Sequence, residues 1–168
     1  RRAYPSGDCT DLMARFTERG YFSRDTVARE SQLSGGPYLD LGTSLGRMGA
    51  DRDEFFAHAD RTHALFPRLF AGLADPVQTL YEQLQTLAVD KEVKTAREAD
   101  GRLYGPAIFR VHYDSHAYRP HIDHVVLREQ RFDYAVSRFE HQFAGVLCLR
   151  NSSQGDGNTP AILHRCLW

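Results

Sequence analysis

The hydrophobic pattern of the chain differs between its first and second halves, and this difference restricts the folds that it can adopt. In the first half apolar residues recur at helical spacing, most clearly over 76–89, where Asp75 can cap the first turn and Pro76 suits the first helical position. In the second half, 108–113 and 143–149 are rich in the aromatic and β-branched residues typical of strands. Helices followed by strands, without regular alternation, predict an α+β chain built on an antiparallel sheet.

The same patterns predict the remaining elements and leave one segment open. We expect helices at 10–19, 23–32, 51–67 and 76–89, strands at 108–113, 121–126, 143–149 and 161–168, and loops at 37–50 and 151–160. The charged segment 127–141 is compatible with either a helix or a long loop. Because the chain starts without Met and stops at Trp168 directly after an apolar run, we expect 1–168 to be a single, incomplete domain.

Composition and charge exclude several classes of protein. With 42% hydrophobic and 26% charged residues, the chain is typical of a soluble globular protein, and it has no apolar stretch long enough to cross a membrane. A net charge of −1 argues against a nucleic-acid coat, which needs a basic surplus. Cys9, Cys148 and Cys166 form no CxxC pair, so we expect no disulfide framework, no structural zinc site and a cytoplasmic location. Cys148 lies in an apolar run and is expected to be a buried, small hydrophobic residue.

The pair His121 and Asp123 is the main candidate for chemistry. Residues i and i+2 of a strand point to the same face, so the predicted strand presents an imidazole nitrogen and a carboxylate oxygen side by side. These two donors suit a divalent first-row metal, and a second histidine from a distant strand would complete the triad of non-haem Fe(II) oxygenases. The alternative is a solvated strand on which the two side chains simply hydrogen-bond each other.

The other histidines are weaker candidates. His124 would lie on the strand face opposite to the pair, and His116 falls in a turn. A zinc site built from His116, His121 and His124 is therefore poorly spaced. His58 and His63 do not share a face of their predicted helix, and we expect both to face solvent. His141 is close to Asp123 in sequence and is a poor candidate for a distal ligand.

His121 and Asp123, separated by one residue, form an HxD pair, and the segment around this pair carries a wider pattern. Tyr104, Pro106 and Arg110 precede His121, and a later predicted strand ends in Trp168. In this arrangement the chain resembles the Fe(II)- and 2-oxoglutarate-dependent oxygenases, and in particular the branch that hydroxylates or halogenates free small molecules. The resemblance covers roughly Gly101 to Trp168, with a fainter likeness upstream.

The resemblance implies a fold and an arrangement of the missing ligands. It implies a double-stranded β-helix (jelly-roll, cupin-like) core with the N-terminal helices packed on one sheet, truncated at the C-terminus. On this basis 1–100 is the mainly helical N-terminal part and 101–168 is the first half of the jelly-roll core. In the family the strand ending in Trp precedes the distal metal histidine and an arginine that binds 2-oxoglutarate. We therefore expect both beyond Trp168, with His164 as a weaker alternative for the distal histidine.

The resemblance also implies roles for individual residues. His121 and Asp123 would hold Fe(II), with 2-oxoglutarate as cosubstrate and O₂ as oxidant. Halogenating members carry a small residue in place of the carboxylate, so Asp123 favours hydroxylation. Arg110 would bind a carboxylate of 2-oxoglutarate or of the substrate, the alternative being a surface arginine on an edge strand. Tyr104 would line the pocket, and Asn151 borders a loop that could close over the site.

The resulting hypothesis is a dioxygenase that hydroxylates a small-molecule substrate, releases succinate and CO₂, and binds neither nucleic acid nor a membrane. Two alternatives stay open. The first is a cupin-type metal-binding protein that uses the same histidine and aspartate, and dependence on 2-oxoglutarate separates it from the oxygenase. The second is a non-catalytic jelly-roll binding module without a metal, for which a His121→Ala variant would have unchanged metal content and ligand binding.

Overall fold

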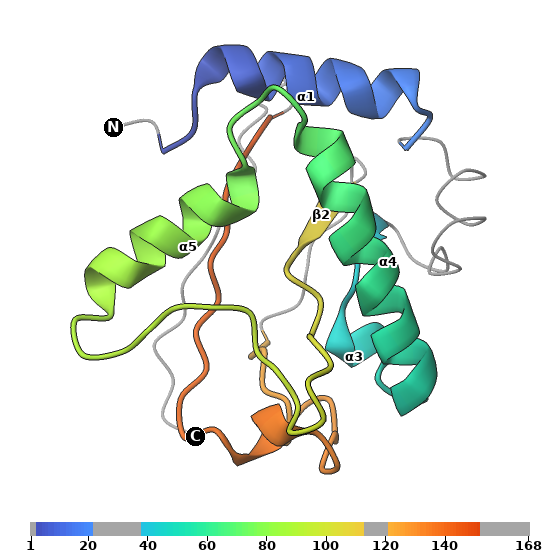
Figure 1. The fold of residues 1–168 in the computed structure, drawn as a ribbon, viewed down its shortest axis with the longest axis vertical. Coiled ribbons are helices and arrows are strands. Elements are labelled where there is room, and N and C mark those ends of the chain that lie inside the picture. The colour runs from blue at the N-terminus through green and yellow to red at the C-terminus, as the bar shows by residue number, and fades with distance from the viewer. Residues whose placement is uncertain (1–2, 22–37, 113–120, 152–168) are drawn as a thin grey trace.

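The computed structural model describes residues 3–21, 38–112 and 121–151 of the chain. The elements are α1 (Ser6–Glu18), β1 (Tyr38–Gly42), α3 (Leu45–Met48), α4 (Arg52–Phe70), α5 (Pro76–Leu87), β2 (Ile108–His112) and the 3₁₀-helix η1 (Ala135–Arg138). In Figure 1, α1 runs across the top, and α4 and α5 extend below it on either side of β2. The predicted α+β class is confirmed. The helix expected at 23–32 and the strand expected at 161–168 lie outside the described residues.

The longest helix, α4, is defined by a cap at its start and by packing at its end. The Asp51 carboxylate accepts the N–H of Glu54 at 2.9 Å, which satisfies one of the unpaired donors of the first turn. The predicted helix is confirmed, but it continues beyond Pro67. The continuation is stabilised by Leu69, whose side chain is completely buried and whose carbonyl accepts a hydrogen bond from Arg15 of α1.

Helix α5 also starts where the sequence predicts. The Asp75 carboxylate accepts the N–H of Gln78 at 3.0 Å, and Pro76 occupies the first turn. Its apolar residues contact other segments: Leu80 packs against Gly145, and the Tyr81 hydroxyl donates to the Pro106 carbonyl 2.9 Å away. Among the described residues, none of the helices has the length and apolarity required to span a membrane.

The sheet consists of β1 and β2, paired antiparallel. Its register places Leu39 opposite Val111, Leu41 opposite Phe109, and Asp40 opposite Arg110. Because side chains alternate along a strand, the four apolar residues share one face and the ionic pair lies on the other. The sheet therefore has an apolar side and a charged side.

The segment 37–50 was expected to be a loop because it is rich in glycine, and this prediction is wrong in part. It contains β1 and the short helix α3. Leu39 and Leu41 alternate with a polar residue, and both leucines are buried, which is the pattern of a half-buried strand. Gly42 ends the strand with φ +112°, and a Cβ there would meet the Ala107 carbonyl oxygen at 2.4 Å. Glycine is therefore required at this position, because the backbone at Ala107 lies too close for a side chain.

Two apolar clusters hold the elements together. The first joins α1, α4 and the apolar side of the sheet, and contains Leu12, Phe16, Tyr21, Leu41, Phe66, Leu69 and Phe70. The second joins the start of α4 to later segments, and contains Phe55, Phe56, Tyr104 and Tyr134. The rings of Phe55 and Tyr134 pack edge-on, with their centroids 5.5 Å apart. This second cluster anchors the chain just beyond the HxD pair.

Two predicted strands are not strands in the structure. Residues 121–124 are irregular and are followed by a series of turns, so the strand at 121–126 is wrong. The segment 143–149 is also irregular, and Cys148, expected to be buried, is exposed. One of its described contacts is with helix α1, where the Cys9 Sγ lies 2.7 Å from the Leu149 carbonyl oxygen. Aromatic and β-branched composition measures suitability for a pleated surface, and a strand forms only where a neighbouring strand pairs with it. The described part thus contains a two-stranded sheet rather than a jelly-roll.

The two histidines of α4 do not face solvent as expected, because several segments pack against this helix. His58 is buried, with its Nδ1 2.8 Å from the hydroxyl of Thr43, which in turn lies 2.7 Å from the hydroxyl of Thr62. His63 is half-buried, and its Nε2 lies 2.8 Å from a backbone carbonyl oxygen. Burial, assisted by the charge of Arg61, holds the pKa of His58 below its usual 6.5.

We predict that His58 makes the free energy of unfolding decrease as the pH falls from about 7 to about 5. Over this range the unfolded chain binds a proton at His58 that the folded chain does not bind, so protonation favours unfolding. A His58→Gln variant, which can still hydrogen-bond to Thr43, should lose this part of the pH dependence. Urea unfolding of both proteins across this range measures the effect, and parallel pH profiles would contradict it.

Candidate metal centre

The HxD pair lies in an irregular segment that leads into a series of backbone turns. The Arg128 N–H donates to the His124 carbonyl at 3.0 Å, and the Gln130 N–H donates to that of Val126 at 3.2 Å. His124 stabilises the start of these turns, because its Nδ1 accepts the N–H groups of Val126 and Leu127 at 3.2 and 3.1 Å. His124 thus stabilises the backbone turns beside the pair.

The side chains of His121 and Asp123 lie close together, although the segment that carries them is not a strand. The His121 Nε2 lies 3.8 Å from the Asp123 Oδ1, and both side chains are accessible to solvent. An imidazole nitrogen and a carboxylate oxygen therefore face the same region of space. This is the juxtaposition expected from the spacing, produced here by an extended irregular backbone.

A second charged residue, Arg128, contacts the same carboxylate. Its Nη1 donates to the Asp123 Oδ1 at 2.6 Å and to the Ile122 carbonyl at 3.3 Å. Its Nε lies 3.5 Å from the Glu129 Oε1. This contact was not predicted from the sequence, because a charged segment does not indicate which of its side chains will contact the HxD pair. The only signal was the local excess of charge in 127–141.

Arg110 lies in a separate ionic group on the charged side of the sheet. Its Nε and Nη2 donate to the two oxygens of Asp40 at 2.6 and 2.7 Å, so the guanidinium binds the carboxylate with both prongs. Arg47 of α3 approaches the same carboxylate at 3.3 Å. Asp40 is fully buried, so this group is part of the framework that holds the two strands together. Asp40 was not singled out from the sequence, since its partner is distant along the chain.

Helix α3 lies between the two charged groups. On one side Arg47 reaches Asp40. On the other, the Glu129 carboxylate lies so close to Gly46 that a Cβ there would meet the Glu129 Cδ at 2.6 Å. The Arg131 Nη2 also points to the Gly46 carbonyl, 3.5 Å away. The HxD segment is therefore connected through α3 to the strand that carries Arg110.

Tyr104 is buried among aromatic rings rather than exposed in a pocket. Its hydroxyl donates to Glu98, which also accepts the Ala135 N–H at 2.9 Å and pairs with Arg52 at 2.8 Å. Burial alone would raise the pKa of Glu98, but the hydrogen bonds and the Arg52 charge outweigh it and hold the pKa below the usual value. Burial, together with the Glu98 contact, raises the pKa of Tyr104. This group fixes η1, and with it the chain that follows the HxD pair.

The remaining predicted residues contribute little to the described geometry. Asn151 is exposed at the end of the described residues, and His164 lies outside them. His141 is exposed, and its ring stacks near that of Phe143.

The two donors of the pair fit Fe(II) in chemical type. One neutral imidazole nitrogen and one carboxylate oxygen are two of the three protein ligands of the facial triad. Among the described residues no group of three or more His, Cys, Asp or Glu side chains could hold a metal ion, so the third ligand would come from outside them.

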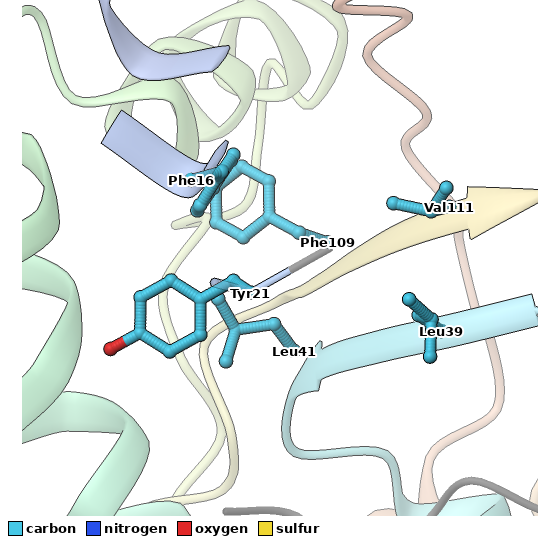
Figure 2. A pocket seen from close by; sticks show the side chains of 6 residues that line it. All are labelled: Phe16, Tyr21, Leu39, Leu41, Phe109 and Val111. Carbon is cyan, nitrogen blue, oxygen red and sulfur yellow. The ribbon is translucent and has the colours of Figure 1, made fainter. Parts of the chain in front are cut away.

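A small apolar pocket lies elsewhere in the fold. Figure 2 shows it between α1 and the sheet, lined by Phe16, Tyr21, Leu39, Leu41, Phe109 and Val111. The strand residues among these point away from the charged side of the sheet. The pocket is therefore part of the first apolar cluster and separate from the candidate metal centre.

Comparison with known proteins gives one match. A family model described as "Carrier-protein-independent halogenase WelO5" matches residues 1–157. The chain has no significant match among curated proteins or among solved structures.

We predict that an Arg110→Met variant loses about 1–3 kcal/mol of stability, because the buried Asp40 carboxylate keeps only the longer contact with Arg47. Arg102→Met is the matched control: its side chain is 30% exposed, against 29% for Arg110, but its carboxylate partners are themselves exposed. The control should unfold at nearly the wild-type urea concentration. Equal losses in the two variants would show that the burial of Asp40 does not matter.

Proposed function

The chain belongs to the family of the carrier-protein-independent halogenase WelO5, and on this basis we propose that it hydroxylates a free small-molecule substrate, with release of succinate and CO₂. Enzymes of this family depend on Fe(II), 2-oxoglutarate and O₂. We also propose the double-stranded β-helix core of these oxygenases for the whole domain. The observation that supports the proposal is the distance of 3.8 Å between the Asp123 Oδ1 and the His121 Nε2.

The proposed roles begin with the metal. His121 and Asp123 would hold Fe(II) through their nitrogen and oxygen donors, and a distal histidine from outside the described residues would be the third ligand. When bound, the iron with its cosubstrate and O₂ supplies the oxidising power that removes a hydrogen atom from the substrate. The protein keeps the two donors together by means of the turns after Asp123 and the buried anchor at η1.

The preference for hydroxylation follows from Asp123. The resemblance implies that halogenating members have a small residue at this place, where a halide can approach the metal. Here a carboxylate occupies it, and its negative charge disfavours a second anion at the same place. The proposed reaction therefore differs from the activity named in the family description.

Arg110 is proposed to bind a carboxylate of 2-oxoglutarate or of the substrate. In support, two arginines, Arg47 and Arg110, converge on the single carboxylate of Asp40 on the charged side of the sheet. The fixed Asp40 holds the Arg110 guanidinium in one orientation, which reduces the entropy lost on binding. Tyr104 is proposed to have an indirect role, in which it fixes the position of η1 through Glu98. Asn151 is proposed to border the mouth of the site.

The test is 2-oxoglutarate turnover by the full-length protein with Fe(II) under O₂, measured as succinate release. His121→Ala and Asp123→Ala should each lower the rate more than about 100-fold, since even the outer partners of metal ligands typically contribute 10- to 100-fold. His141→Ala, an exposed histidine on the following segment, is the control and should leave the rate unchanged.

Product analysis in the presence of chloride separates the two oxidations. With any substrate that is turned over, the wild-type protein should add oxygen and not halogen. A halogenated product formed with Asp123 intact would overturn the proposed reaction. Succinate release that does not depend on His121 would instead overturn the assignment of the metal site.

A further inference from the structure

We propose that Arg128 controls access of the metal to Asp123 by alternating between the carboxylates of Asp123 and Glu129. The inference rests on the proposed function, because it takes His121 and Asp123 as the metal ligands. In this proposal Arg128 and Glu129 are positioning residues that do not bind the metal but change the affinity of the site for Fe(II).

The first step concerns a single oxygen atom. The Asp123 Oδ1 is the carboxylate oxygen that lies 3.8 Å from the His121 Nε2. The same atom receives the Arg128 guanidinium at 2.6 Å. A cation shared by the imidazole and this oxygen needs the lone pairs to which Arg128 donates. The guanidinium therefore competes with the metal for the ligand and also repels it by its charge.

The second step concerns the strength of this contact. The side chain of Asp123 is 56% exposed and that of Arg128 is 40% exposed. Ion pairs so accessible to water contribute little free energy, in contrast to the buried Asp40 group. A divalent cation that also binds an imidazole can thus displace Arg128 from Asp123. The contact lowers metal affinity without blocking the site.

The third step is the alternative partner. The Arg128 Nε already lies 3.5 Å from the Glu129 Oε1, so the guanidinium can leave Asp123 and remain paired. The Glu129 carboxylate lies against α3, where a Cβ at Gly46 would meet its Cδ at 2.6 Å. Arg128 thus has two carboxylates within reach, that of the exposed Asp123 and that of the half-buried Glu129. Glu129 should therefore favour metal binding, and Arg128 should oppose it.

The experiment is an anaerobic calorimetric titration of Fe(II) into the full-length protein, without 2-oxoglutarate. Arg128→Gln should tighten Fe(II) binding by about three- to fivefold, the range expected of an exposed ion pair, and Glu129→Gln should weaken it by about the same factor. The double variant should bind like Arg128→Gln alone, because Glu129 acts through the arginine. Arg128→Lys, which keeps the positive charge, should restore an affinity close to that of the wild-type protein.

The control is Arg138→Gln, which removes one positive charge from the exposed end of η1 and should leave the Fe(II) affinity unchanged. Circular dichroism and the thermal unfolding midpoint establish that each variant is folded. Because the readout is metal affinity, a purely structural role of Arg128 would not produce the predicted tightening.

The possible outcomes separate the two proposals. If Arg128→Gln binds Fe(II) as the wild-type protein does or more weakly, Arg128 does not compete with the metal and the inference is wrong. If Glu129→Gln weakens binding equally in the Arg128→Gln background, Glu129 acts on the metal directly and the alternation of Arg128 between the two carboxylates is wrong. If Fe(II) binding is unaffected in His121→Ala, the metal site itself is misassigned, and it is the proposed function that fails.

Discussion

The buried carboxylate of Asp40 is the constraint on which the other parts of the site depend. A charge completely removed from water must be paired, and the two-pronged contact with Arg110 joins β1 to β2 at the centre of the sheet. Arg47 adds α3 to this group. Because Glu129 lies against α3, this group also connects the charged side of the sheet to the segment that carries the HxD pair.

The predictability of the fold depended on whether the determining contacts were local. The helix starts at Asp51 and Asp75 could be predicted, since a cap and its donors lie within one turn. The strands at 121–126 and 143–149 could not, because a strand requires a partner that local composition does not reveal. The number of glycines in 37–50 concealed β1, although the alternation of Leu39, Asp40 and Leu41 would have indicated it.

The same distinction applies to the site. His121 and Asp123 could be paired from their spacing alone, because two residues separated by one must lie close together in an extended backbone, strand or not. The contacts of Asp40 with Arg110 and of Glu98 with Arg52 join distant parts of the chain, and no short-range pattern specifies them. Arg128 is close to Asp123 in sequence, yet its contact depends on the intervening turns, which the charged composition did not predict.

Family membership and individual residues answer different questions about the reaction. The match over residues 1–157 gives the cofactors, which every member needs for the shared oxidation. The product depends on the anions that surround the metal. In the proposed scheme, a small residue at the position of Asp123 would leave room for a halide ion from solution. A carboxylate at this position is instead an anion bound covalently to the protein. Arg128 donates to that carboxylate at 2.6 Å and partly offsets its charge before a metal binds. In the proposed scheme the metal displaces the arginine, so Asp123 is paired in the empty site and keeps its full negative charge in the loaded one.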